Sequence, residues 1–512
     1  MVKCIRNKER KKRELEIYIH IPFCVKKCAY CDFLSGPAGK AEQKAYVEAL
    51  QKEIASFGGM EVMSSEGANA GNCKGQEGGK LPEYMVVSVF FGGGTPSILN
   101  ADWIGKILTL LKKRFEFRED VEITIECNPG TADRKKLKAY REYGINRISF
   151  GLQSADNEEL QLLGRIHTWE QFLETYQEAR AAGFSNINVD LMSSLPGQSR
   201  ASWKKTLEKV LALEPEHISA YSLIIEEGTP FYEKYEEDAR LREEGEVPEY
   251  LPSEEEEREM YRLTEEMLLG AGMHRYEISN YAKEGYECRH NIGYWIGTEY
   301  VGFGLGASSY LRKTEQEHTS ERGNKISENC EGKIRENLSV FGDWKDGIQN
   351  TGEKIEAVEG TTMTRVQNTQ DMQKYLAADF SWQKKGKGLK DSSCRKEGAC
   401  QEKLSYQEER DSQEYLHCWN QGNCSEDLSG RETEILSVED QMAEFMFLGL
   451  RMMRGVSEAE FEQRFGQEID AVYGAVMETQ CDLGLLERED GRIRLTPRGI
   501  DLSNRVMAEF LL

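Results

Sequence analysis

The chain has 512 residues, of which 30% are charged, and a formal net charge of −23 at pH 7. Phosphate backbones repel so acidic a chain, so we expect no nucleic-acid partner. No run of about eighteen apolar residues occurs, which excludes a transmembrane helix but not peripheral contact with a membrane.

The opening residues, 1–10, are basic and polar and lack the apolar segment of a secretory signal. The 13 cysteines are an odd number in a large chain, which argues against a disulfide framework. We therefore expect a protein of the reducing cytoplasm.

Three cysteines follow the first predicted strand at spacings of four and three: Cys24, Cys28 and Cys31. By chance this spacing would occur only about 0.01 times in such a chain. Three thiolates can bind three irons of a cubane iron–sulfur cluster and leave the fourth iron open. The alternatives are a loop of buried thiols or a zinc site, but structural zinc takes four ligands and no partner pair follows closely. The spacing predicts a [4Fe–4S] cluster.

The first three hundred residues alternate between apolar, β-branched runs and amphipathic stretches. The runs are residues 16–21, 86–91, 121–125, 147–150, 186–191 and 217–223. Six such units predict an α/β fold: a parallel sheet curved into a partial (β/α)6 barrel, with the active loops at the carboxyl ends of its strands.

Glycine and polar residues follow successive predicted strands, where they would face the barrel mouth. Gly93, Gly94 and Thr95 lie in a glycine-rich turn that lets charged groups approach backbone N–H groups. Further on come Glu126, Gln153, Arg165 and Asp190. Carboxylates and amides at these positions can bind ribose hydroxyls and an adenine edge, although each could also be a solvated loop residue or a helix cap.

The cysteine spacing after a short strand, with Tyr30 before the last cysteine, resembles the radical S-adenosylmethionine (SAM) superfamily. In that superfamily SAM binds the open iron of a [4Fe–4S] cluster, and an electron from the cluster cleaves its sulfonium group. The resemblance implies both cofactors, an electron donor for the cluster, and a glycine-rich loop that contacts the SAM amino group.

Within the superfamily, the chain is similar to the oxygen-independent coproporphyrinogen oxidase branch. The residues that match its pattern are Tyr18, the turn at 92–96, Glu126, Gln153, Arg165 and Asp190. The resemblance implies that Tyr18, Glu126 and the cluster loop contact the SAM on the cluster. It also implies that Gln153, Arg165 and Asp190 contact a second nucleotide-like site.

The branch contains oxidases, which decarboxylate propionates, and heme chaperones of the HemW subfamily, which bind heme and pass it to apo-hemoproteins. The oxidase type has another cysteine two residues after the third, where this chain has Phe33. Phe33 and the segments 275–281 and 288–295 resemble the chaperone subfamily. We therefore expect a heme chaperone; the alternatives are a coproporphyrinogen III oxidase and a radical SAM enzyme for an unrelated substrate.

The segment His290-Asn291-x-x-Tyr294-Trp295 could contribute to heme binding, with His290 on the iron and the aromatic residues on the macrocycle. The alternative is a buried histidine that is hydrogen-bonded to the protein. Relatives often carry histidine at the position of Ser308, so a heme ligand in that loop is not expected.

The segment 312–432 is polar and without sustained periodicity, which predicts a disordered insertion, and a smaller one is expected at 58–80. The cysteines of the larger segment repeat one spacing, Cys394 with Cys400 and Cys418 with Cys424. Free thiols explain them better than a metal site, because five intervening residues exceed the usual zinc spacing.

After this segment, helical patterns at 437–454, 457–465 and 469–481 precede a short hairpin near 493–495. This order predicts a winged-helix-like unit, acting as a lid or docking module, whose methionines form its core. The expected domains are a barrel at 1–230, its extension at 231–311, the insertion at 312–432 and this unit at 433–512. Both a monomer and a dimer are compatible with the sequence.

Overall fold

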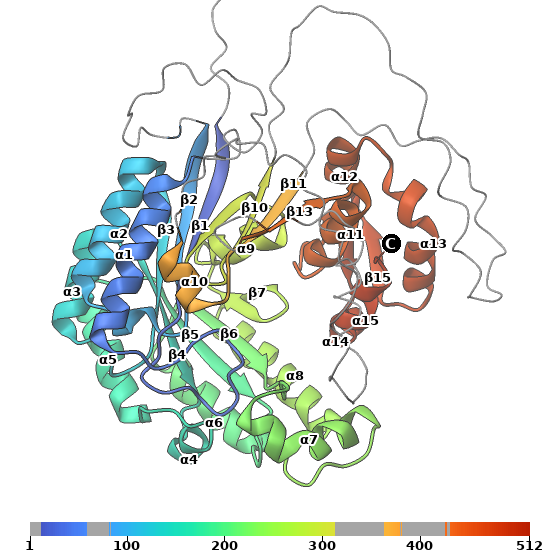
Figure 1. The fold of residues 1–512 in the computed structure, drawn as a ribbon. Helices are drawn as coiled ribbons and strands as arrows, with labels where there is room; N and C mark the ends of the chain where they lie inside the picture. The colour runs from blue at the N-terminus through green and yellow to red at the C-terminus, as the bar shows by residue number, and fades with distance from the viewer. Residues whose placement is uncertain are drawn as a thin grey trace, which may run out of the picture.

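The computed structural model describes residues 12–58, 81, 83–312, 363–378, 380, 425–426 and 431–511. A strongly curved sheet has helices on its outer side, and a smaller helical unit lies beside one edge of the sheet (Figure 1). The smaller expected insertion and the paired cysteines of the larger one lie outside the described residues.

Six parallel strands form the barrel, and they pair in chain order. They are β1 (Arg13–Ile21), β2 (Tyr84–Gly93), β3 (Glu116–Cys127), β4 (Arg147–Gln153), β5 (Ile187–Ser193) and β6 (His217–Ser222). The parallel partial barrel expected from the six apolar runs is confirmed.

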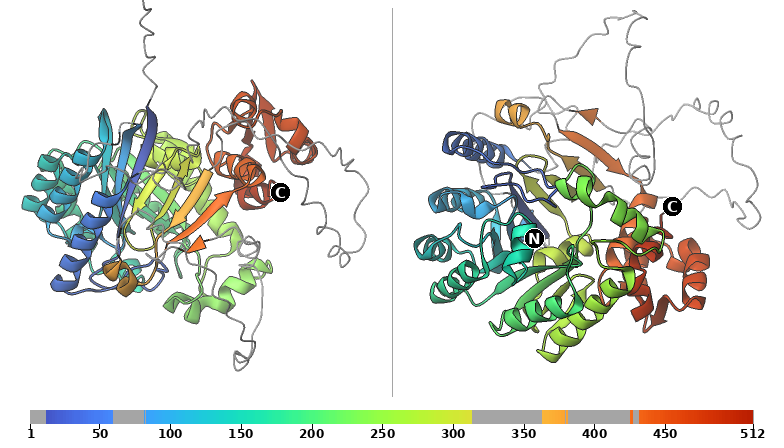
Figure 2. Two further views of the ribbon diagram at one scale, coloured as in Figure 1. Left: turned by 45° about the horizontal axis from the view of Figure 1, so that its top comes forward. Right: turned by 90° about the horizontal axis from the view of Figure 1, so that it is seen from below.

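Helices connect these strands and cover the outer face of the sheet, as the two views of Figure 2 show. They are α1 (Lys40–Ser56), α2 (Ala101–Arg114), α3 (Arg134–Tyr143), α4 (Asn157–Leu162), α5 (Trp169–Ala181) and α6 (Arg200–Leu211). A short 3-10 turn, η2 (Pro96–Ile98), follows β2, and α7 (Pro230–Glu243) and α8 (Glu254–Gly270) follow β6. Ser253 and Glu256 form a capping box that explains the acidic start of α8.

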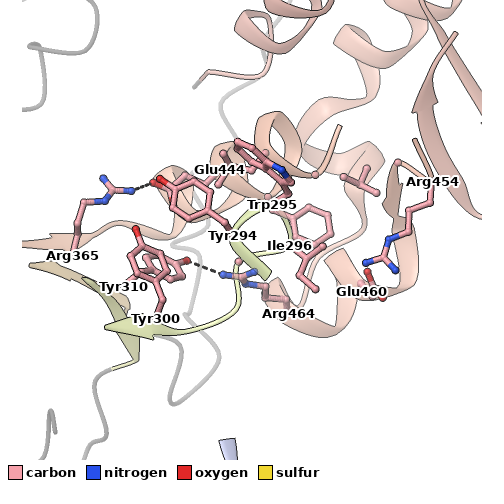
Figure 3. A pocket seen from close by; sticks show the side chains of 16 residues that line it. Tyr294, Trp295, Ile296, Tyr300, Tyr310, Arg365, Glu444, Arg454, Glu460 and Arg464 are labelled. Carbon is pink, nitrogen blue, oxygen red and sulfur yellow. Dashed lines mark hydrogen bonds and ion pairs between the residues drawn. The ribbon is translucent and has the colours of Figure 1, made fainter. Parts of the chain in front are cut away.

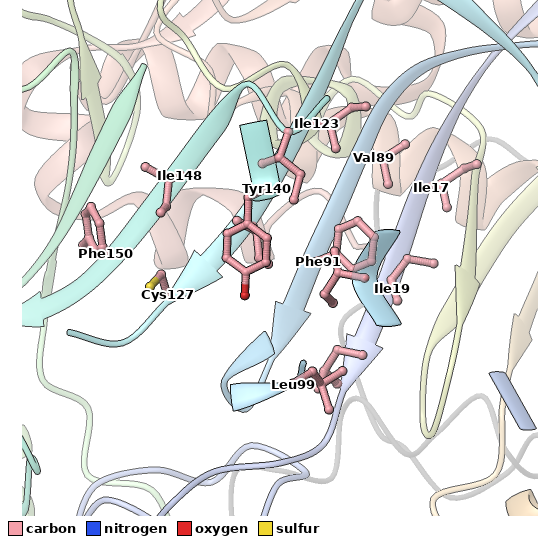
Figure 4. Close-up of a cluster of buried hydrophobic side chains, with 14 of the residues drawn as sticks. Ile17, Ile19, Val89, Phe91, Leu99, Ile123, Cys127, Tyr140, Ile148 and Phe150 are labelled. Carbon is pink, nitrogen blue, oxygen red and sulfur yellow. The ribbon is translucent and has the colours of Figure 1, made fainter. Parts of the chain in front are cut away.

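Alternation along each strand divides the sheet into an apolar outer face and a polar inner face. Ile17 and Ile19 of β1 are fully buried in the main core, together with Val89 and Phe91 of β2. Figure 4 shows this layer between the strands and the helices. The intervening positions, such as Tyr18, face the inside of the barrel. Side chains there are not needed for the apolar core and can contribute to a binding site.

The sheet continues beyond the barrel on both sides, and within the described residues it has thirteen strands in the order β12-β13-β11-β10-β9-β1-β2-β3-β4-β5-β6-β8-β7. The added elements are β7 (His274–Glu277), β8 (Asn280–Ala282), α9 (Arg289–Trp295), β9 (Tyr300–Phe303), β10 (Ser308–Arg312), β11 (Met363–Gln367), α10 (Met372–Ala377), β12 (Ser425–Glu426) and β13 (Glu432–Leu436). Helix α9 carries the segment 290–295 and packs near β2.

Part of the segment expected to be a disordered insertion is ordered. Strand β11 pairs with β10 on one side and with β13 on the other, and α10 packs on α1. The buried carboxylate of Glu53 in α1 accepts hydrogen bonds from Asn368 at 2.8 Å, Tyr375 at 2.8 Å and Arg431 at 3.0 Å. These long-range polar contacts stabilise residues whose local sequence pattern does not predict a helix or a strand.

The C-terminal unit has a core of its own, which includes Met442, Met446 and Met477. Its elements are α11 (Val438–Gly449), β14 (Val456–Ser457), α12 (Glu458–Phe465), α13 (Ile469–Asp482), β15 (Leu486–Glu489), β16 (Arg492–Leu495), α14 (Pro497–Asp501) and α15 (Ser503–Ala508). Its loop 451–455 joins the barrel, where Met453 donates a backbone hydrogen bond to Tyr276 at 3.0 Å. In the part of the chain that the structure describes, no helix is long and apolar enough to cross a bilayer.

Candidate functional site

A cavity of about 500 Å³ opens at the carboxyl ends of β1–β6. It brings together residues of β2–β6 and of the loops that follow the strands, including the cysteine loop after β1. The predicted site residues that line it are Cys24, Cys28, Cys31, Phe33, Gly93, Gly94, Thr95, Glu126, Gln153, Arg165 and Asp190. Of the predicted residues, Tyr18 and His290 are not in its lining.

The cysteine loop follows β1 and forms one wall of the cavity. All three thiols are free and partly exposed. Thr95 Oγ1 donates to Cys24 Sγ at 3.5 Å, and burial raises the pKa of Cys31. The described residues contain no group of three or more His, Cys, Asp or Glu placed to hold a single metal ion. Three free thiols on one cavity wall fit the donor set of a cluster, in which each thiolate binds a different iron.

The glycine-rich turn after β2 lies directly against the cysteine loop. Gly93 has φ +110°, and a Cβ there would lie 2.7 Å from the imidazole of His20. A Cβ on Gly94 would lie 2.7 Å from the carbonyl oxygen of Phe23 and 3.0 Å from Cys24 Sγ. Gly93 is therefore required by its positive φ and by the imidazole beneath it, and Gly94 by its close approach to the cysteine loop.

Two carboxylates face the cavity, Glu126 from β3 and Asp190 from β5, with β4 between these strands. Glu126 Oε2 accepts a hydrogen bond from the backbone N–H of Gly93 at 3.1 Å. Burial raises the pKa of Glu126 to about 8, and repulsion from Asp190 adds to the effect. Asp190 accepts from Asn188 at 2.7 Å and from Ser149 at 3.2 Å, and burial raises its pKa as well. A cationic ligand would favour the ionised forms of both groups.

Arg165 joins the cysteine loop to the ends of β3 and β4. Its guanidinium donates to Cys28 Sγ at 3.6 Å, to Asn128 Oδ1 at 2.7 Å and to the carbonyl oxygen of Gly151. Gln153 at the end of β4 has φ +73°, a strained value for a residue with a side chain, and its Oε1 accepts from Tyr221 at 2.7 Å. Strain of this kind is typical of residues that are held in place for function.

Tyr18 lies on the inner face of β1, below the cavity. Its hydroxyl is hydrogen-bonded to His20 Nδ1 at 3.1 Å, and its ring is stacked on Phe90 at 6.3 Å. Burial raises the pKa of the phenol well above its usual value, so Tyr18 stays neutral. From this position it supports the residues of the cavity wall from beneath.

His290 is packed inside the barrel and does not reach the cavity. Its Nδ1 is hydrogen-bonded to Ser88 Oγ at 2.8 Å, and its ring is stacked on Phe90 at 5.0 Å. Burial lowers the pKa of His290 to about 3, with a further effect from the Arg147 cation, so the imidazole is neutral. The structure thus places His290 as a buried, hydrogen-bonded side chain, whereas Tyr294 of the same helix is 44% exposed.

Several cavity residues were missed by the sequence analysis, among them Asn188 and Tyr221. Asn188 is two residues before Asp190, and therefore faces the same side of β5. Strict alternation within the predicted strand could have revealed it. The orientation of Asn128 toward Arg165 depends on the packing of two loops, which no local pattern encodes.

Comparison with known proteins agrees with this site. Residues 76–210 match the model of the radical SAM superfamily, and residues 436–502 match that of the HemN C-terminal domain. The protein named heme chaperone HemW from Bacillus subtilis is 28% identical over 495 residues, which cover 96% of this chain and 98% of that protein. The protein of the same name from Escherichia coli is 35% identical over 294 residues, covering 57% of this chain and 69% of that protein.

A solved structure has a similar fold. It is that of coproporphyrinogen III oxidase (HemN) from Escherichia coli, a radical SAM enzyme, with a TM-score of 0.63 and 19% identity over 98% of this chain and 90% of that chain. The curved sheet, the cysteine loop at its mouth and these similarities agree with one another. The chain therefore belongs to the radical SAM superfamily and, within its HemN-like branch, to the HemW family.

Proposed function

We propose that the protein is a heme chaperone, which binds a [4Fe–4S] cluster, SAM and heme and delivers heme to apo-hemoproteins. The observation that carries this proposal is similarity to a protein named heme chaperone HemW along almost the whole length of both chains. Phe33 supports it, because the oxidase type has a cysteine at that position and this chain presents an exposed phenyl ring.

The cavity offers a place for each group that the radical SAM family implies. Cys24, Cys28 and Cys31 would bind the cluster, which with SAM supplies one-electron chemistry. The backbone of Gly93 and Gly94 would accommodate the polar end of SAM close to the cysteines. The cavity of about 500 Å³ is within the usual range for a cofactor of this size.

The remaining cavity residues would position these groups. In this proposal, ionised Glu126 and Asp190 hold positive charge and hydroxyl groups of bound SAM. Arg165 fixes Cys28 against the ends of β3 and β4, and Gln153 and Tyr221 form the wall opposite the glycine-rich turn. Tyr18 and His20 support the floor beneath this turn.

The proposed partners are an electron donor for the cluster and the apo-hemoproteins that receive heme. We place this exchange in the cytoplasm, where reduced thiols are stable. The C-terminal unit would act as a docking or lid module, because it has its own core and contacts the barrel through the loop 451–455.

The test is an optical titration with hemin and an oxidase assay on one anaerobically reconstituted preparation. We expect a saturating change in the Soret band, transfer of the heme to an apo-hemoprotein, and no decarboxylation of coproporphyrinogen III in the presence of SAM and reductant. Absence of heme binding would refute the proposal. Release of protoporphyrinogen would instead identify an oxidase.

A further inference from the structure

A second cavity, of about 60 Å³, lies between the barrel and the C-terminal unit (Figure 3). One side is formed by α9, β9, β10 and β11, and the other by α11, the loop 451–455 and α12. It is separate from the cysteine cavity, with which it shares no lining residue. Nothing in the proposed cluster and SAM chemistry uses it.

The barrel side of this cavity is a row of tyrosine rings. Tyr294 and Tyr300 lie 5.4 Å apart between ring centroids, and Tyr300 is stacked on Tyr310 at 6.0 Å. Of the lining residues, Tyr294 is 44% and Ile296 is 43% exposed. Large apolar side chains exposed beside a cavity are typical of a binding surface for a flat apolar ligand.

Three arginines come together at the same cavity from separate elements: Arg365 of β11, Arg454 of the loop 451–455, and Arg464 of α12. Arg464 Nη2 donates to the hydroxyl of Tyr310 at 2.9 Å. Its guanidinium lies over Gly297, where a Cβ would be only 3.0 Å from Nη1. The missing side chain of Gly297 thus leaves room for Arg464 at the cavity wall.

Arg464 has no carboxylate at ion-pair distance among the described residues, although the charge of Glu444 acts on it from further away. Its hydrogen-bond acceptor is the phenol of Tyr310. A guanidinium carries five N–H donors, so it has capacity for a bidentate contact with a further carboxylate.

Two carboxylates also line the cavity, and their negative charge opposes the binding of an anionic ligand. Glu444 is held by Arg365, which also contacts Glu434 at 3.3 Å. Glu460 is the other. Arg365 is therefore occupied by Glu434 and Glu444, and an anionic ligand at this cavity would depend on Arg464.

We infer that this second cavity receives a carboxylate-bearing edge of a tetrapyrrole, with Arg464 on a propionate and Tyr294 and Ile296 against the macrocycle; the inference rests on the proposed function. A volume of about 60 Å³ holds about four waters, which suits a propionate arm but not the whole ring. The macrocycle would therefore lie at the open end, between the barrel and the C-terminal unit.

The test compares hemin with its dimethyl ester, which lacks the free carboxylates, in optical titrations of the full-length reconstituted protein. For Arg464→Gln we expect the dissociation constant for hemin to rise at least about tenfold, because a charge-assisted hydrogen bond is lost. Its affinity for the ester should stay at the wild-type value, and Arg464→Lys should retain part of the affinity for hemin. Tyr294→Ala should weaken both ligands, because it removes contact area without removing charge.

The matched control is Arg505→Gln, an exposed arginine of α15 away from this cavity. Far-UV circular dichroism and the cluster absorption of each variant check that the fold and the other site are intact. If wild-type protein binds no hemin, the proposed function fails. If it binds hemin and Arg464→Gln binds both ligands as wild type does, the function stands and the second cavity is not the site.

Discussion

Arg165 and Cys28 are 137 positions apart in the chain, yet the guanidinium donates a hydrogen bond to the thiol sulfur at 3.6 Å. A cation that donates to a cluster ligand stabilises the electron-rich state of that cluster. We expect Arg165→Gln to lower the midpoint potential by about 60 mV, equivalent to a tenfold change in a one-electron equilibrium. A redox titration followed at the cluster absorption measures it, with Arg118→Gln, a half-buried arginine of β3 outside the cavity lining, as the control. An unchanged potential would show that the contact is not made in the loaded protein.

Cys28 and Cys127 provide a matched pair for the cluster assignment, since both thiols are free and both line the cavity. Cys28→Ala removes one of three proposed ligands, so the brown cluster absorption of the reconstituted protein should be lost. Cys127→Ala should retain it, because that thiol lies outside the cysteine loop and its pKa is raised by burial to about 11. Iron and sulfide analysis of both variants checks the result; a full cubane in Cys28→Ala would contradict the ligand set.

Glu126 should make the stability of the ligand-free protein depend on pH. Its folded pKa of about 8 lies above its ordinary value of 4.5, so the folded state retains a proton that the unfolded state loses. The stabilisation of the folded state by protonated Glu126 is fully present below about pH 4.5. It falls, by up to about 1.4 kcal/mol per pH unit, until about pH 8. Glu126→Gln imitates the protonated group and does not titrate. The unfolding free energy of the variant minus that of wild type should therefore increase as the pH rises from 5 to 8.

Denaturant titrations of the cluster-free protein at several pH values measure this difference. Glu174→Gln, at an exposed position of α5, is the control and should follow wild type at each pH. A constant difference between Glu126→Gln and wild type would mean that Glu126 is ionised throughout this range.

Glu53 holds the β11–α10 segment to the barrel through buried contacts with Asn368, Tyr375 and Arg431. Glu53→Ala leaves the Arg431 guanidinium buried without this carboxylate, which should lower the unfolding free energy by about 3–5 kcal/mol. Proteolysis within 363–380 should become faster than in wild type. Glu48→Ala on the exposed face of α1 should change stability by less than about 0.5 kcal/mol. Equal protease resistance in wild type and Glu53→Ala would show that other contacts hold this segment.

The barrel was predictable because its strands carry their signal locally. Ile17 and Ile19 alternate with Tyr18 along β1, and the apolar face faces the helices as the period of two requires. The cavity residues followed from the same rule, because polar residues that end parallel strands meet at one edge of the sheet. The sequence alone therefore predicts that Cys24 and Glu126 lie at the same edge of the sheet.

Other features depend on contacts that are distant in the sequence. Strand β11 and helix α10 lie within a polar segment, and their order depends on partners such as Glu53 and β13. His290 could be assigned a possible role from its neighbours, but the direction of its side chain depends on Ser88 of β2. The gathering of Arg365 and Arg464 around one cavity requires two domains to be placed together, which no single segment specifies.

The pairing of β10 with β11 has a consequence for how this chain can vary. Arg312 and Met363 are cross-strand partners, so the polypeptide leaves the sheet and returns to it at the same point. Replacing residues 313–362 with a four-residue turn would convert the two strands into an ordinary hairpin, and the shorter closure would contribute about 2 kcal/mol. The length of the chain between Arg312 and Met363 can therefore change without moving β1, and with it the position of the cysteine loop.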